Sequence, residues 1–177
     1  INYIRGQDQE KFRSRQSGQE IFLLGDTANS SPIIVSEPSS NYHLLYGDQS
    51  YQAFLEQYQG RRSRIFLATN DGVLHSFNAG WFDGKAKYLK NSPEGGAKWD
   101  LGQETWAFVP FAALPYLSEV SNKHYGISPN HHLNLFGQRI YIFDAKVFDH
   151  NGLVGQADQL DRKTHPKGWG TLMVVGV

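Results

Sequence analysis

Residues 65–78, which read IFLATNDGVLHSFN, decide the fold of this chain. Two apolar runs, Ile65–Thr69 and Val73–Phe77, flank the tripeptide Asn-Asp-Gly. Aspartate followed by glycine between apolar runs is a strong short-range signal for a β-hairpin. Because side chains alternate between the two faces of a strand, His75 is expected to share a face with the residues two positions before and after it. We therefore predict an antiparallel hairpin here.

Short apolar runs separated by turn residues recur along the rest of the chain, which predicts a mainly β structure. The other predicted strands are Ile21–Leu24, Ile33–Val35, Glu104–Val109, Arg139–Phe143, Ala145–Phe148 and Thr171–Val177, and the fourth and fifth make a pair with Asp144 between them. The intervening segments 78–103, 122–137 and 149–170 carry many polar residues and glycines. We expect them to form long surface loops.

One segment carries a helical pattern. Ser50–Tyr58 has apolar residues at spacings of three, one and three, which places them on one face of a helix. Asp48 or Ser50 is expected to cap its N-terminus, and Gly60 to end it. A second short helical turn is predicted at Phe111–Leu117.

The composition excludes several classes of protein. The chain has 177 residues, of which 40% are hydrophobic and 19% charged, so we expect an ordered fold. Seventeen basic and 17 acidic residues leave a formal net charge of zero, which argues against a nucleic-acid partner. There is no cysteine, hence no disulfide or thiolate nucleophile.

The two ends of the sequence are also informative. No run of about 18 apolar residues is present, so no membrane-spanning helix is expected. The start at Ile1 lacks the pattern of a signal peptide, and the last residues form an apolar run. From these features we interpret the chain as a piece of a longer protein.

The polar residues that stand out are interpreted mainly as structural. Asp71 is expected to stabilise the hairpin turn and Asp26 a loop, because aspartate bonds to its own backbone in turns. Adjacent His131 and His132 would point to opposite faces of a strand and cannot share one ion. His75 is expected to pack inside the sheet. The remaining histidines lie in predicted loops without ligand spacing: His43, His124, His150 and His165.

Oxygen ligands gather in one predicted loop. Asp149, Asn151 and Asp158 surround a glycine, which makes them calcium candidates, although their spacing differs from the EF-hand pattern. A solvated loop is the alternative interpretation.

Five sequence blocks, in order, carry a resemblance to a known family. Residues 65–78 resemble the propeller repeat of PQQ-dependent quinoproteins and their relatives, in which an Asp-Gly turn precedes a strand of the form Leu-His-Ala-Phe-Asn. Taken with the other blocks, the chain resembles the C-terminal propeller of the PilY/PilC family of type IV pilus proteins. The blocks are NYIRG at 2–6, LGD at 24–26 with SSPIIV at 30–35, NDGVLHSFN at 70–78, WAFVP at 106–110 followed by Leu114 and Leu117, and WGTLMVVG at 169–176.

The chain also departs from the family pattern. Asn29 stands where the family usually has histidine, and the block from His131 to Asp144 is blurred. The calcium loop typical of a later blade falls after residue 177, so its role is not carried over to any residue of this chain.

The resemblance implies an all-β fold, namely a partial β-propeller with quinoprotein-like blades, long loop insertions and a short helix near 50–58. Residues 1–177 are expected to form a single domain, the N-terminal portion of such a propeller. A propeller has about 4–8 blades of four strands each. The motif residues to which the resemblance assigns a structural role are Gly25, Asp26, Ser31, Pro32, Asn70, Asp71, Gly72, His75, Phe77 and Trp169.

For function, the resemblance implies a non-enzymatic type IV pilus tip adhesin and biogenesis factor. It would lie at the pilus tip or outer membrane of a Gram-negative cell and take part in virulence. Its partners would be minor pilins or other pilus components, and a host or surface ligand. The resemblance implies no cofactor in this segment and calcium in the full family domain. The alternatives are a fragment of a PQQ-dependent dehydrogenase and a generic propeller that anchors envelope proteins.

Two groups of side chains have both a structural and a binding interpretation. Arg61, Arg62 and Arg64 are interpreted as a solvated lead-in to a strand, with an acidic lipid or pilin surface as the alternative partner. The basic residues Arg5, Lys11, Arg13 and Arg15 are likewise taken as solvated. Among the tryptophans, Trp81, Trp99 and Trp169 are the candidates for a carbohydrate or protein contact surface, and Trp106 is expected in the core.

Overall fold

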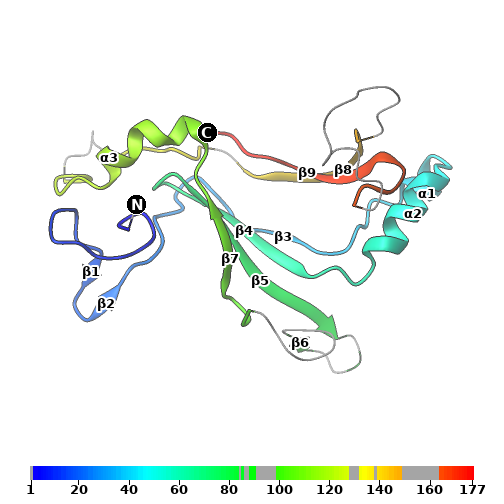
Figure 1. The fold of residues 1–177 in the computed structure, drawn as a ribbon, viewed down its shortest axis with the longest axis horizontal. Helices are drawn as coiled ribbons and strands as arrows, with labels where there is room; N and C mark the ends of the chain where they lie inside the picture. Colours follow the sequence, from blue (N-terminus) through cyan, green and yellow to red (C-terminus); the bar gives the residue numbers. More distant parts are fainter. Residues whose placement is uncertain are drawn as a thin grey trace.

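The computed structural model describes residues 2–83, 85, 88–90, 99–127, 132–137, 139–148 and 164–177. Its described part consists mainly of antiparallel strands with a few short helices (Figure 1). The strands are β1 (Gln16–Ser17), β2 (Glu20–Ile21), β3 (Ile33–Val35), β4 (Ser63–Thr69), β5 (Val73–Asp83), β6 (Tyr88–Lys90), β7 (Glu104–Phe108), β8 (Tyr141–Lys146) and β9 (Trp169–Val174). The helices are α1 (Tyr42–Leu45), α2 (Gln49–Tyr58), the 3-10 helix η1 (Phe111–Tyr116), α3 (Leu117–Val120) and the 3-10 helix η2 (Pro166–Gly168).

The central sheet is built around the predicted hairpin, which the structure confirms. β4 and β5 pair antiparallel, with Leu67 opposite His75 and Thr69 opposite Val73. Gly72 closes the turn with a φ of 84°, a conformation that glycine adopts without the steric penalty of a side chain. β3 pairs with the outer edge of β4, and β7 with the other edge of β5. Four neighbouring strands therefore follow one another in the order β3, β4, β5, β7 (Figure 1).

The second arm of the hairpin is longer than predicted. β5 continues past Asn78 to Asp83, so the predicted loop 78–103 begins as a strand. This extension is stabilised by pairing, since Ser63 lies opposite Gly80 and β6 pairs with residues 81–83. The Asn78 side chain also donates two hydrogen bonds, to the backbone carbonyls of Trp99 and Asp100, both at 3.0 Å.

The prediction of two separate strands with Asp144 between them is wrong. β8 is a single strand that runs through Asp144 and pairs antiparallel with β9. The carboxylate is accommodated within the strand, because it accepts hydrogen bonds from the Tyr51 hydroxyl at 2.8 Å and from the Thr171 hydroxyl at 2.7 Å. The last strand is β9, which begins at Trp169 and ends at Val174 rather than spanning 171–177.

The predicted strand Ile21–Leu24 is also wrong beyond its first residue. β2 ends at Ile21, and the backbone then passes alongside Arg15. The Arg15 guanidinium donates to the carbonyls of Phe22 and Leu23, at 3.3 and 3.0 Å. A side chain therefore replaces a neighbouring strand as the partner of these carbonyls.

The helices largely follow the predictions. α2 begins after Asp48, whose carboxylate accepts from the Ser50 amide at 2.8 Å, and Gly60 follows its end with a φ of 72°. The second predicted turn is found as η1, which runs into α3. His43 belongs to α1, so its prediction as a loop residue is wrong. No helix in the described segments is long and apolar enough to cross a membrane.

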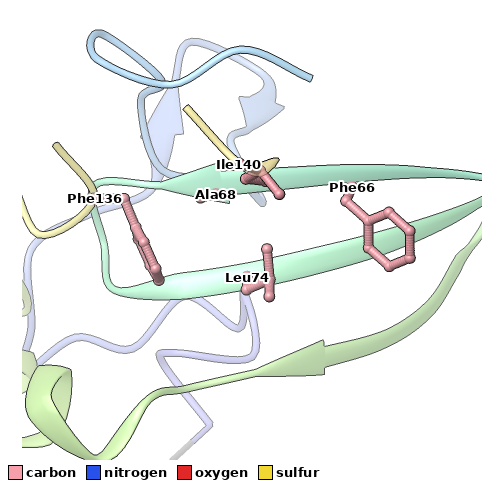
Figure 2. Close-up of a cluster of buried hydrophobic side chains, with 5 residues drawn as sticks. All are labelled: Phe66, Ala68, Leu74, Phe136 and Ile140. Carbon is pink, nitrogen blue, oxygen red and sulfur yellow. The ribbon is translucent and has the colours of Figure 1, made fainter. Parts of the chain in front are cut away.

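Side chains join the central sheet to the β8–β9 ribbon. The core cluster consists of Phe66, Ala68, Leu74, Phe136 and Ile140, and Figure 2 shows the last two approaching the β4–β5 hairpin. Side chains from both β-sheets, including Ile33, Val35, Ile142 and Met173, pack against it.

A second, aromatic cluster anchors α2 to β9. It consists of Tyr51, Phe54 and Trp169. Trp169 is 6% exposed, so its prediction as a contact-surface residue is wrong. Trp106 is more exposed than predicted. It lies on β7 with 39% of its surface exposed, although its ring contacts Phe66, and the expectation of a core position is not met.

Candidate functional site

The hairpin turn receives the loop that carries Gly25 and Asp26. The Asn70 backbone amide donates to the Asp26 carbonyl at 2.8 Å, and the Asn70 side chain donates to the Asp26 carboxylate. Gly25 lies so close to the turn that an added Cβ would be 2.6 Å from Cγ of Asp71. The structure thus brings together motif residues that are far apart in the sequence, with Asp26 and Asp71 on either side of the contact between loop and turn.

A buried cation completes this cluster. Arg15 is 6% exposed, and its Nη2 atom lies 3.7 Å from Oδ2 of Asp71. Its guanidinium also stacks on the ring of Tyr3, 4.5 Å from the centroid. The interpretation of Arg15 as solvated is therefore wrong. The sequence gives no signal for this burial, because the carbonyls and the carboxylate that Arg15 contacts come from separate segments.

His75 connects the turn cluster to β7. Its Nε2 atom is 3.2 Å from the Thr69 hydroxyl, and its Nδ1 atom is 2.6 Å from a carboxylate oxygen of Glu104. His75 is 5% exposed, which confirms its predicted packing inside the sheet. A carboxylate, an imidazole and a hydroxyl in series also occur in hydrolases. Here Thr69 is fully buried and its hydroxyl donates to Asp71, so this geometry suits fixing the strands rather than attacking a substrate.

His132 contacts the same cluster from outside. Its Nε2 atom is 3.0 Å from Oδ2 of Asp26, and His132 lies outside any strand, in the segment expected to form a loop. Partial burial alone would raise the pKa of Asp26, but hydrogen bonds from Asn70 and His132 lower it, and the net pKa lies below its usual value. The carboxylate is therefore held in its charged form as an acceptor for both neighbours.

An apolar cavity of about 1280 Å³ lies beside this cluster. One wall is the face of β5 that carries Val73, His75 and Phe77, which share a face as predicted. The opposite walls come from the N-terminal segment, including Phe12 and residues 21–24, and from Leu114 and Leu117. Such a cavity is suited to holding an apolar surface, with the His75–Glu104 pair as its main polar feature.

The remaining motif and candidate residues lie apart from this cluster. Ser31 and Pro32 are exposed and lead into β3, and Trp169 donates its indole N–H to the Ser50 hydroxyl at 2.8 Å. Asp149, Asn151 and Asp158 lie outside the described residues. In the described part of the chain, no three acidic or histidine side chains are placed to hold a metal ion.

The chain has recognisable relatives among characterised proteins. It is 31% identical over 166 residues to a type IV pilus biogenesis factor PilY1 homolog of Xylella fastidiosa, a match that covers 88% of this chain and 11% of that protein. It is 27% identical over 132 residues to the type IV pilus biogenesis factor PilY1 of Pseudomonas aeruginosa, covering 71% of this chain and 9% of that protein. The chain thus spans about a tenth of the length of these relatives. No family model and no solved structure matches it.

The fold and the relatives together define the class. The described residues form a mainly antiparallel β structure whose glycine-containing hairpin is fixed by a buried polar cluster. The chain belongs to the PilY1-related family, which confirms the resemblance seen in its sequence blocks.

Proposed function

We propose that the protein containing this chain is a type IV pilus biogenesis factor of the bacterial cell surface, which acts by binding rather than by catalysis. The observation that carries this proposal is the match to biogenesis factors over 88% of the chain. In this proposal its partners are minor pilins or other pilus components. Its place is the pilus tip or the outer membrane.

We extend the proposal to the architecture. β3, β4, β5 and β7 are four antiparallel strands, each paired with its neighbour in that order, and a propeller blade also has four antiparallel strands; the short strand β6 pairs in addition with the end of β5. In the full domain this sheet would be one blade, the β8–β9 ribbon would belong to another, and a later blade would carry the calcium expected for the family. The polar cluster at the hairpin turn would keep the blade rigid.

The binding role is supported by the apolar surface of the chain. Several large side chains are exposed, among them Phe111 at 88%, Leu44 at 73% and Phe82 at 65%. Exposed apolar surface beyond scattered single residues is typical of contact sites between proteins. In this proposal a rigid platform presents such surfaces for pilus assembly and for adhesion to a host or a surface.

The experiment is complementation of a strain that lacks the gene. The wild-type gene is expected to restore surface pili, twitching motility and attachment. Gly25→Ala, which forces the loop against Asp71, is expected to restore less, and Gly137→Ala is expected to act as wild type, because a Cβ there meets nothing within 4 Å. Pili are counted by electron microscopy, and protein levels by immunoblot. Normal piliation and motility in the deletion strain would contradict the proposal.

A further inference from the structure

A second cavity lies where the start of β4 meets the β8–β9 ribbon. Its volume is about 230 Å³, and Arg61, Arg62 and Arg64 line it. Arg64 and Phe66 alternate along β4, so these two side chains belong to the same face, and Arg62 lies just before the strand. Leu172 and Met173 of β9 also line the cavity, together with Ile142 of β8. The cavity thus combines cationic side chains with an apolar wall.

The three guanidinium groups differ in how they are held. Arg61 donates from Nε to the Ser36 carbonyl at 2.8 Å and from Nη1 to the Thr171 hydroxyl at 2.9 Å. Arg64 donates from Nη1 to the Thr105 hydroxyl at 3.0 Å. These two side chains are therefore fixed in place by neutral oxygen acceptors.

Arg62 is held by aromatic rings instead. Its guanidinium carbon lies 4.6 Å from the ring of Trp81 and 4.6 Å from the ring of Trp99. Its Nη1 atom is buried and has no hydrogen-bond partner. A buried donor without an acceptor is costly, by about 1–3 kcal/mol. Arg62 is thus oriented by its neighbours while part of its hydrogen-bonding capacity is unused.

The arginines of the cavity form no direct ion pair in the described part of the chain. Among the described residues, no carboxylate lies within 4 Å of any of the three guanidinium groups. Burial lowers the pKa of Arg64, and the charge of Arg62 lowers it further. Burial also lowers the pKa of Arg61, although Asp144 acts in the opposite sense. An anion in the cavity would oppose the lowering of both pKa values.

We propose that this arginine cavity binds a carboxylate carried on an apolar stem, such as the side chain of a glutamate from a partner protein. Guanidinium groups match the planar geometry of a carboxylate and bond to it through two parallel hydrogen bonds. The apolar wall formed by Phe66, Ile142 and Met173 then accepts the methylene groups of the stem. A free phosphate has no apolar part and would leave this wall in contact with water. The volume equals that of several water molecules at about 30 Å³ each, which suits one side chain.

The test is chemical footprinting of arginines with phenylglyoxal in the complete protein, with hexanoate as the probe and mass spectrometry as the readout. At a hexanoate concentration about ten times its dissociation constant, modification of Arg62 and Arg64 is expected to slow about elevenfold, because only the unliganded fraction reacts. Arg139, which is exposed and outside the cavity, is expected to react at an unchanged rate. In Arg62→Gln, the protection of Arg64 is expected to fall.

Two comparison probes decide the chemistry of the ligand. 1-Hexanol has the stem without the charge, and inorganic phosphate at the same ionic strength has charge without a stem, so neither is expected to protect as well as hexanoate. Equal protection by either probe, or unchanged modification of Arg62 with hexanoate, would overturn the proposal. The assay contains no pili, so its result is independent of the role in pilus biogenesis.

Discussion

Replacing Gly25 by alanine tests whether contact between the loop and the hairpin turn stabilises this region. The new Cβ would lie 2.6 Å from Cγ, 2.8 Å from Oδ1 and 2.9 Å from Cβ of Asp71. Asp71 is 3% exposed and bonded to Thr69 and Arg15, so it cannot move without breaking contacts. Overpacking costs about 1–3 kcal/mol, and a polar group left without its partner costs about 1–3 kcal/mol more.

The expected net loss in the free energy of unfolding is about 1–5.5 kcal/mol, since the reduced entropy of the unfolded chain returns about 0.4–1 kcal/mol of the combined cost. Gly137→Ala is the matched control. It has nothing within 4 Å and no positive φ, so it should be neutral or stabilising by about the same 0.4–1 kcal/mol. Urea unfolding followed by tryptophan fluorescence measures the free energy of unfolding of both variants. If the two variants agree within about 0.5 kcal/mol, loop and turn do not stabilise one another as described.

Three other changes have expected outcomes. Burial raises the pKa of Tyr51, as does its carboxylate partner, so the neutral phenol stabilises the fold below pH about 10 and this contribution is lost as the pH rises further. Tyr51→Phe should therefore lower the free energy of unfolding by about 1–3 kcal/mol at neutral pH, and its Tm should fall less steeply above pH about 10 than the Tm of the wild type. An equally steep fall would contradict this. Phe136→Ala should cost about 3–5 kcal/mol in urea unfolding, whereas Phe111→Ala, at an 88% exposed position, should stay within about 0.5 kcal/mol of wild type. The lowered pKa of Asp26 adds stability above pH about 4, and this contribution is lost on further acidification. The Tm of Asp26→Asn should therefore depend less on pH below about 4 than the Tm of the wild type. An equally steep fall of Tm in the variant would count against this role of Asp26.

The hairpin was predictable because its information is local. Asp71 and Gly72 specify a turn by their own chemistry, and the flanking apolar runs supply the strands. The cap at Asp48 is local in the same sense, since its acceptor and the donor at Ser50 are two residues apart. The close approach at Gly25 was signalled only by the family motif.

The errors arose where distant segments supply the partners. Asp144 interrupts the apolar pattern, and nothing nearby in the sequence shows that Tyr51 will donate to it inside a strand. The sequence predicts Arg15 and Arg62 as solvated for the same reason, since the rings and carbonyls that surround them come from other segments. The sequence also does not show which tryptophan is buried. Trp169 is buried because α2 packs on β9.

The junction between the central sheet and the β8–β9 ribbon has a mechanical consequence. In the described part of the chain, the two share no strand pairing, and they are joined by packed side chains and by Arg61, which bonds to Ser36 on one side and Thr171 on the other. Side-chain packing can yield while each ladder of backbone hydrogen bonds stays intact. A pulling force across this junction should therefore separate two intact pieces before either one unravels, which makes the junction the compliant element of this segment.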